Sequence, residues 1–240
     1  MTCFLTSSHC VQGAPLLNPA NGFLDMLRES LRHARSVLFI TSAPDDVDFT
    51  DRVAWETWEV FHNADIRFDR YAVLDRRNEY EAERLVRDAD LVFLAGGHVP
   101  TQNDFFHDIR LKALLEDFDG VILGVSAGSM NCAEIVYSHP ELDGESVDPG
   151  FRRFRSGLGL TQTNMIPHYQ NVKDDVLDGL HLFWDIAVPD SVGNRFYALP
   201  DGSFIYSCDG YEELRGEAYL LEGGAMRKIS REGDAICLSY

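Results

Sequence analysis

One stretch of the chain, Gly120 to Tyr137 (GVILGVSAGSMNCAEIVY), constrains the fold more than any other. It opens with a short apolar run typical of a buried strand, turns sharply around Ser126, and continues with apolar residues that predict a packed helix. A serine at the apex of a strand, a turn and a helix is the arrangement of a nucleophile elbow. Gly124 and Gly128 fit this interpretation, because side chains there would clash with the closely approaching backbone. The alternative is an ordinary turn in which Ser126 only caps the helix.

Before this stretch, extended apolar segments alternate with segments of helical periodicity. Strands are predicted at residues 3–7, 36–42, 66–74 and 91–94, and helices at 23–33, 53–62, 80–88 and 104–115. This alternation predicts an α/β fold with a mostly parallel sheet sandwiched by helices. Ligand sites in such sheets lie at the carboxyl ends of the strands, where both Ser126 and the Gly96-Gly97 pair fall.

The sequence pattern changes after Ser138. Residues 140–150 (PELDGESVDPG) are acidic and rich in turn formers, which predicts an exposed loop. Short extended pieces are predicted at 154–160 and 164–168, and a helix within 175–188. From Arg195 onwards, short β segments separated by Asp-Gly and Gly-Gly turns predict two or three antiparallel strands that extend or cap the sheet. No linker or repeat divides the chain, so we expect residues 1–240 to form a single α/β domain.

The net charge of −18 over 240 residues argues against some classes of binding partner. Nucleic acids and anionic membranes are bound by basic surfaces, so we expect neither as a partner. No apolar run approaches the length of a membrane span, no signal-peptide pattern starts the sequence, and the five cysteines are scattered without metal-binding spacing. These features predict a cytoplasmic protein with free thiols and with no metal or cofactor. A homodimer is an assembly that the sequence leaves open.

A serine nucleophile needs a base, and the base needs an acid that fixes its tautomer. Of the eight histidines, His168 and His98 are the leading candidates. We favour His168, because it lies in an extended, apolar-flanked segment that would present the imidazole at a strand end. The loop position of His98 suits a residue that borders the site and contacts the substrate. For the acid, Asp201 stands at a predicted boundary between a strand and a turn, and its competitors are Asp174, Asp175 and Asp209.

Four short motifs together resemble one family. They are LAGG (94–97), GVSAGS (124–129), IPHY (166–169) and LPDGS (199–203). In this order and spacing they are similar to the peptidase E group, serine hydrolases of the aspartyl dipeptidase and cyanophycinase type with a class I glutamine amidotransferase-like fold. The resemblance implies that Ser126 is the nucleophile, His168 the base and Asp201 the acid, where the family often has glutamate. It also implies an oxyanion hole formed by the backbone N–H groups of Gly97 and Ala127.

Two features depart from the family pattern. The family usually has Gly-Gly-Asn where this chain has Gly96-Gly97-His98, so the loop bordering the site is altered. Dipeptidase members carry an arginine after the histidine that holds the acidic side chain of the substrate, whereas residues 169–193 contain no arginine and one lysine, Lys173. The resemblance therefore implies a serine peptidase or amidase that cleaves a small peptide or amide through an acyl-enzyme on Ser126, and the missing arginine argues against N-terminal aspartyl substrates. The alternatives are a hydrolase of ester or other non-peptide substrates and a non-catalytic small-molecule-binding or regulatory module that has kept the fold.

Overall fold

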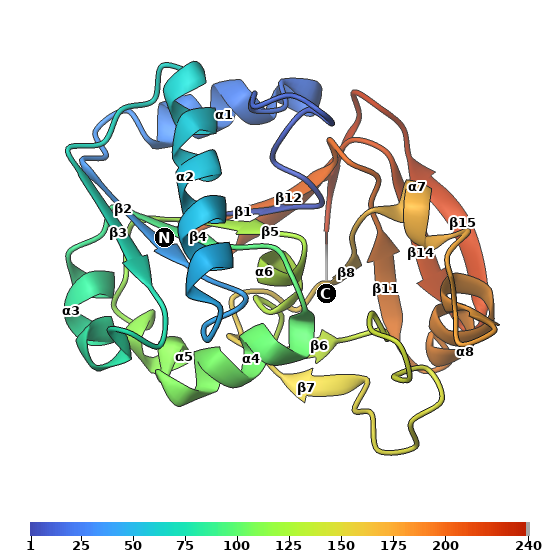
Figure 1. Cartoon of the computed structure of the whole chain (residues 1–240). Coiled ribbons are helices and arrows are strands. Elements are labelled where there is room, and N and C mark those ends of the chain that lie inside the picture. The colour runs from blue at the N-terminus through green and yellow to red at the C-terminus, as the bar shows by residue number, and fades with distance from the viewer. Residues whose placement is uncertain (239–240) are drawn as a thin grey trace.

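The computed structural model describes residues 1–238, and an eight-stranded sheet lies at its centre (Figure 1). The strand order is β16-β13-β12-β1-β5-β4-β2-β3. Five of these strands are parallel and nearly continuous in apolar sequence, as expected where helices cover both faces. They are β1 (Thr2–Thr6), β2 (Ser36–Ile40), β3 (Arg70–Leu74), β4 (Leu91–Leu94) and β5 (Val121–Val125).

Three antiparallel strands extend this sheet beyond β1. They are β12 (Phe204–Cys208), β13 (Tyr211–Arg215) and β16 (Ala235–Cys237). The predicted α/β class, with a mostly parallel sheet and antiparallel C-terminal strands, is confirmed. The sequence pattern did not indicate β13, because its sequence (YEELR) is mostly charged although both of its glutamates are buried.

Helices cover both faces of the central sheet (Figure 1). On one face, α1 (Phe23–Ser30) and α2 (Val47–Asn63) pack against a cluster of phenylalanines that includes Phe4, Phe39 and Phe93. On the other face lie α3 (Ala82–Arg87), α4 (Val99–Asp108), α5 (Leu111–Leu114) and α6 (Ala127–Met130). The 3₁₀ turns η1 (Ala20–Gly22) and η2 (Glu79–Glu81) precede α1 and α3. Two buried layers therefore hold the parallel strands rigidly from either side.

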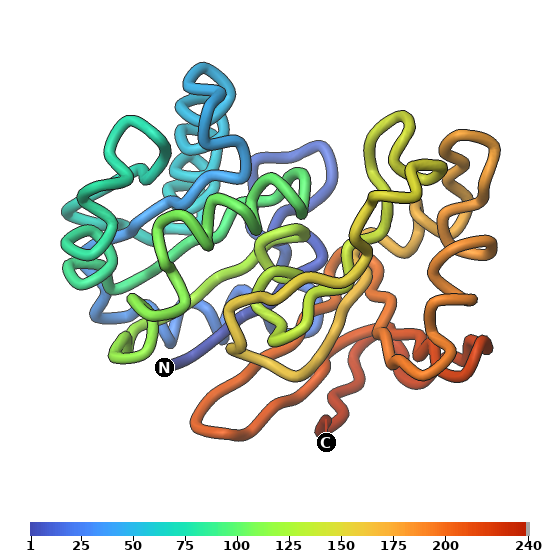
Figure 2. Tube along the Cα trace, turned by 90° about the horizontal axis from the view of Figure 1, so that it is seen from below, coloured from blue at the N-terminus to red at the C-terminus, as the bar shows by residue number. Residues whose placement is uncertain are grey.

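A second, four-stranded sheet lies to one side of the first (Figures 1 and 2). Its order is β15-β14-β11-β8, with β15 (Ala225–Ser230), β14 (Ala218–Glu222), β11 (Arg195–Ala198) and β8 (Asn164–Ile166). One face joins the core of the central sheet, and the other packs against α7 (Tyr169–Val172) and a π-helical turn, η3 (Leu182–Ala187), which runs into α8 (Val188–Asp190). Two small pairs complete the structure: β6 (Ile135–Tyr137) with β7 (Phe154–Ser156), and β9 (Val176–Leu177) with β10 (Leu180–His181).

The helix predicted after the elbow is shorter than expected. It ends at Met130, and the segment Ile135–Tyr137, with two β-branched residues and one aromatic residue, forms β6. The carbonyls of Asn131 and Cys132 accept hydrogen bonds from the backbone of residues 158 and 160, at 3.0 and 2.8 Å, so they are not used to continue a helix. Similarly, the helix predicted at 104–115 begins earlier, at Val99, and is interrupted at Arg110, whose φ is 56°.

Across residues 1–238, we find no helix with the length and apolar character needed to cross a bilayer.

Candidate active site

Ser126 occupies a strained turn between β5 and α6. Its φ and ψ are 49° and −112°, a region that residues other than glycine rarely adopt. The backbone holds it there from both sides, because Ser126 N donates to Thr6 O on β1 at 3.0 Å and Ser126 O accepts from Met130 N at 2.9 Å. The side chain therefore lies at the carboxyl edge of the parallel sheet on a backbone that has little freedom to relax.

The two flanking glycines are required by close packing. A Cβ on Gly124 would lie 2.9 Å from the backbone of Ser129, and one on Gly128 would lie 2.2 Å from Leu94 O on β4. Both distances are far inside van der Waals contact. The elbow can therefore form only with glycine before and after the serine, which is the steric reason for the GxSxG pattern.

His168 and Asp201 meet at the ends of two adjacent parallel strands. His168 follows β8 and has a left-handed φ of 54°, while Asp201 lies in the turn between β11 and β12. His168 Nδ1 and Asp201 Oδ1 are 2.7 Å apart. Because a carboxylate only accepts, Nδ1 carries the proton and Nε2 is left with its lone pair.

A buried serine that the sequence analysis overlooked connects this pair. Ser7 Oγ accepts from the backbone N–H of His168 at 2.7 Å and donates to Asp201 Oδ1 at 2.9 Å. Burial tends to raise the pKa of Asp201, but the hydrogen bonds from His168 and Ser7 outweigh it and leave this pKa below its usual value. Ser7 follows β1, so its only signal in the sequence was its place at the end of a predicted strand.

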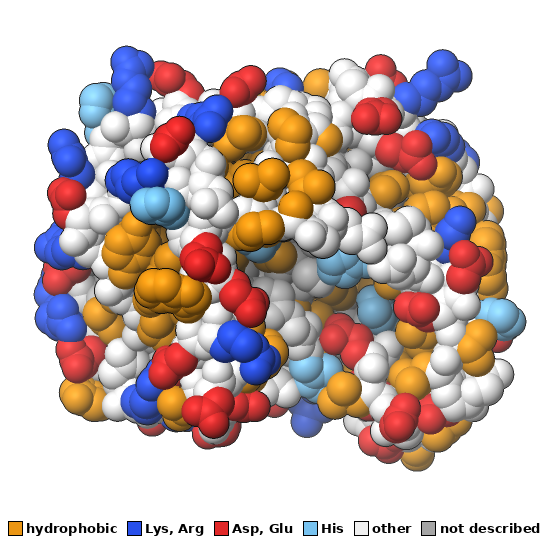
Figure 3. All heavy atoms as spheres, turned by 45° about the horizontal axis from the view of Figure 1, so that its top comes forward, with side chains coloured by type: hydrophobic (Ala, Val, Ile, Leu, Met, Phe, Trp, Pro, Cys, Tyr) orange, Lys and Arg blue, Asp and Glu red, His pale blue; other side chains and the backbone are white. Residues whose placement is uncertain are grey.

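Ser126 and His168 line one cavity of about 270 Å³. Its walls also include His139, Glu141, Asn171 and Asp175. Figure 3 shows a hollow near the middle of this face of the molecule, with histidine and acidic side chains around it. A volume of this order is close to the lower end of small-molecule binding sites, roughly 300 Å³.

The loop after β4 borders the serine. A Cβ on Gly96 would lie 3.5 Å from the Cβ of Ser126, which shows how closely this loop approaches the elbow. Gly97 has a φ of 151°, and a Cβ there would lie 2.2 Å from Ser42 Oγ. Ala127, the first residue of α6, flanks Ser126 from the other side. The two residues expected to form an oxyanion hole therefore lie on the two segments that meet at the serine.

Comparison with known proteins agrees with this geometry. The model of peptidase family S51 matches residues 3–213. The chain belongs to peptidase family S51. No curated protein sequence matches the chain significantly.

Solved structures of similar fold include two bacterial proteins. One is a peptidase from an acI-B1 actinobacterium, with a TM-score of 0.68, 17% identity, and coverage of 99% of this chain and 96% of that one. The other is a Listeria monocytogenes EGD-e protein assigned to peptidase E, with a TM-score of 0.56, 15% identity, and coverage of 95% and 98%. At these identities the likeness concerns the fold, whereas the S51 match supports a peptidase of the peptidase E type.

His98 is not among the residues that line the cavity, but it contacts Glu145, which in turn binds the backbone of the cavity-lining Glu141. Its Nε2 is 2.9 Å from Glu145 Oε1, and its Nδ1 is 2.7 Å from Thr101 Oγ1. His98 therefore connects the start of α4 to the loop 139–150. A direct contact between His98 and substrate stays a prediction.

The segment 140–150, which the sequence predicted to be an exposed loop, is exposed at residues 142–144 and 147–150, whereas its start lies against the cavity. His139 is buried, Glu141 is largely covered, and both line the cavity. The sequence did not indicate that the start of the loop is covered, because turn-forming composition does not reveal which side of a loop faces a neighbouring element. Of the other acids considered beside Asp201, Asp175 also lines the cavity, although it is exposed to solvent like its neighbour Asp174, and Asp209 lies in the turn after β12.

Proposed function

We propose that this S51 member is a serine peptidase or amidase that cleaves a small peptide or amide through an acyl-enzyme on Ser126. The observation that carries the proposal is the placement of His168, which lines the cavity with Ser126 and binds Asp201 through Nδ1. The imidazole of His168 therefore shares a cavity with a serine and has a carboxylate bound to its other nitrogen. This combination activates a serine hydroxyl.

The proposed reaction begins with the transfer of the Ser126 Oγ proton to His168 Nε2 as Oγ attacks the scissile carbonyl carbon. The resulting oxyanion accepts hydrogen bonds from the backbone N–H groups of Gly97 and Ala127, each worth on the order of 3 kcal/mol in a working hydrolase. The imidazolium then gives its proton to the leaving amine, and the acyl-enzyme forms. A water molecule, deprotonated by His168, hydrolyses the ester and restores Ser126.

Asp201 stabilises the imidazolium in both halves of this cycle. Its lowered pKa keeps Asp201 ionised at neutral pH, so its carboxylate can accept the hydrogen bond from His168 Nδ1 in every step of the cycle. Ser7 fixes the carboxylate and the backbone of His168 together, and so it sets the direction of the imidazole.

Labelling with a fluorophosphonate probe, read by intact mass, tests this mechanism. We expect one adduct on the wild-type protein and none on the Ser126→Ala or His168→Ala variants. The exposed His181, which is not among the cavity-lining residues, offers a matched control, and His181→Ala should label like wild type.

A folded wild-type protein that takes no label would favour a binding module that has kept the fold. Labelling without hydrolysis of any peptide or amide would favour an ester or other non-peptide substrate. If labelling survives in Ser126→Ala, the nucleophile is a different residue.

A further inference from the structure

The cavity beside Ser126 has an acidic lining. Glu141, on the loop 139–150, and Asp175, after α7, both contribute carboxylates to its wall. Of the described residues that line it, none is lysine or arginine. Lys173, the lysine in the segment after His168, is not part of the cavity wall. Its Nζ lies 3.8 Å from Asp174 Oδ2 and over the ring of Tyr169.

His139 adds a further acceptor to this lining. Its Nδ1 is 3.1 Å from Pro140 O, and a carbonyl oxygen only accepts, so Nδ1 carries the proton and Nε2 keeps its lone pair. Burial lowers the pKa of His139, which keeps the ring neutral. The wall therefore offers two carboxyl groups and one imidazole acceptor.

Hydrogen bonds hold the loop that carries Glu141 in a defined position. Glu145 Oε2 accepts from the backbone N–H groups of Glu141 and Leu142, at 2.8 and 3.0 Å, while Oε1 binds His98. Two later residues of the same loop are held by Asp178, which accepts from Gly144 N at 3.0 Å and from Ser146 Oγ at 2.7 Å. These contacts hold Glu141 against the cavity although its position is unfavourable for a charge.

The covered position of Glu141 changes its pKa. Burial and the nearby charge of Glu145 raise the pKa of Glu141 to about 8, although the Val99 backbone N–H opposes the shift. A cation in the cavity would stabilise the ionised carboxylate, whereas an acidic side chain would meet a second acid and no positive partner.

We propose that this cavity receives a cationic side chain, so that the preferred substrates carry a lysine-like residue on the acyl side of the scissile bond. The inference rests on the function proposed above. An ammonium group has three donors and no acceptor, which matches a wall of Glu141, Asp175 and the Nε2 of His139. The volume of about 270 Å³ suits one extended side chain.

Steady-state kinetics on matched amides test the substrate class. The substrates are the lysyl, norleucyl and aspartyl 4-nitroanilides, because norleucine has the lysine side chain's length without its ammonium group. We expect kcat/KM for the lysyl compound to exceed that for the norleucyl compound by about 30-fold or more, and the aspartyl compound to be the poorest. Equal rates for lysyl and norleucyl compounds, or a preference for aspartyl, would overturn the proposal.

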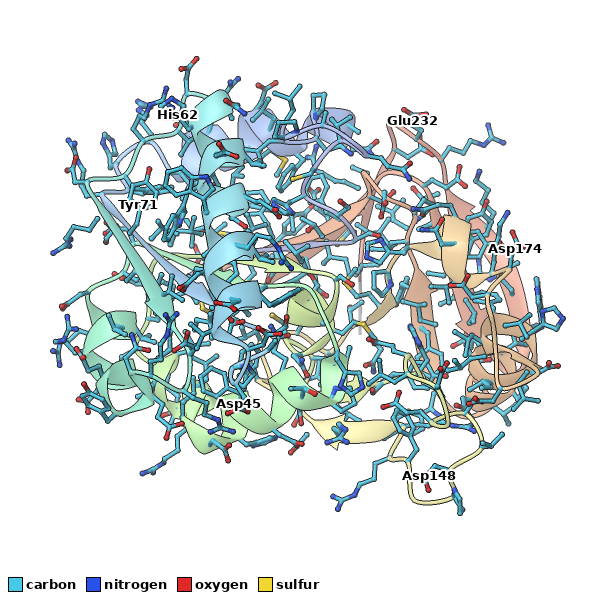
Figure 4. All side chains as sticks on the ribbon, in the orientation of Figure 1. Asp45, His62, Tyr71, Asp148, Asp174 and Glu232 are labelled. Carbon is cyan, nitrogen blue, oxygen red and sulfur yellow. The ribbon has the colours of Figure 1, made fainter. Side chains whose placement is uncertain are left out.

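Variants that remove a charge from the cavity wall test which residues cause the preference for the lysyl substrate. In Glu141→Gln and in Asp175→Asn we expect the ratio of lysyl to norleucyl kcat/KM to fall about tenfold, since each loses one acceptor for the ammonium group. Asp174→Asn is the matched control, because Asp174 neighbours Asp175 in sequence but lies on the outer side of the molecule near α7 (Figure 4). A ratio that is unchanged in both cavity variants would contradict the assignment.

A binding measurement separates this inference from the catalytic proposal. L-lysinamide and L-norleucinamide are titrated calorimetrically into the Ser126→Ala variant, which needs no turnover, and both ligands carry the same α-amino group. Tighter binding of lysinamide by about tenfold, lost in the Ser126→Ala/Glu141→Gln double variant, supports the cationic pocket even if no substrate is cleaved. Equal affinities overturn it even if Ser126 labels normally.

Discussion

At the scale of single residues, the site is built from side chains that sit on unusual backbone. Ser126 and His168 both have positive φ, and both were candidates from the sequence because short motifs surround them. Ser7 and Glu141 were not found, because one is a serine among many and the other lies in an acidic, turn-rich loop that was predicted to be exposed. Their roles depend on which strands and loops are neighbours in space. The pairing of His168 with Asp201 fits the prediction, while its catalytic role stays a proposal.

Replacing Ser7 tests its positioning role. Ser7→Ala removes a donor to Asp201 and leaves the His168 N–H without its acceptor. We expect kcat to fall about tenfold or more while KM stays within about twofold, because Ser7 is not among the cavity-lining residues. Steady-state kinetics measure both constants, and Ser8→Ala, which alters only a local contact with Cys10, is the control. An unchanged kcat would show that Ser7 has no part in orienting the pair.

Asp201→Asn tests the tautomer argument. An asparagine can present its NH₂ to Nδ1, which then loses its proton and leaves the wrong nitrogen facing the serine. We expect kcat to fall by about 10²–10⁴-fold with little change in the urea unfolding midpoint. The same substitution at the exposed Asp174 should leave kcat near wild type. Comparable losses at both positions would show that the effect is not specific to the His168 contact.

At the scale of elements, the parallel half of the chain was predictable because its strands are short, apolar and separated by periodic helices. The prediction failed where tertiary contacts override local pattern. Strand β13 carries two buried glutamates, and Glu212 is stabilised there by Thr161 Oγ1 at 2.6 Å and Thr163 Oγ1 at 2.9 Å, contacts that no local pattern reveals. Helix α6 stops after four residues because the segment after β7 takes the backbone carbonyls that would extend it.

The junction of β5, α6 and β4 leads to a stability prediction. In Gly128→Ala, the new methyl group would lie 2.2 Å from Leu94 O, so either the helix or the strand must shift. We expect a loss of about 2–4 kcal/mol in the free energy of unfolding, measured by urea denaturation. Gly150→Ala is the control, because its added methyl group meets only the side chain of Asp148, at 3.2 Å, at the outer end of a loop (Figure 4). If the two variants unfold alike, the elbow is less tightly packed than the structure indicates.

At the scale of the whole molecule, the net charge of −18 and the buried ionisable groups act on stability together. His9 has both ring nitrogens buried and, within residues 1–238, without a hydrogen-bond partner, and burial lowers its pKa to about 4. The unfolded chain therefore binds a proton at His9 between about pH 4 and 6.5 that the folded chain does not, so this group makes stability rise with pH over that range. Glu141 has the opposite sign, because its folded pKa of about 8 lies above its unfolded value.

The Glu141 contribution predicts how the free energy of unfolding changes between about pH 6.5 and 8. Between about pH 6.5 and 8, His9 no longer contributes a slope, while folded Glu141 still binds a proton that the unfolded chain has lost, so stability falls as pH rises. Self-repulsion of the excess negative charge acts in the same direction but is screened by salt, whereas the covered Glu141 is screened much less. Urea unfolding at 0.5 M NaCl, across this range, should therefore still show a decline in wild type, on the order of 2 kcal/mol, that is much smaller in Glu141→Gln. Equal slopes in the two proteins would mean that Glu141 is already ionised in the empty cavity; the acidic wall would then hold its full charge before any cation enters.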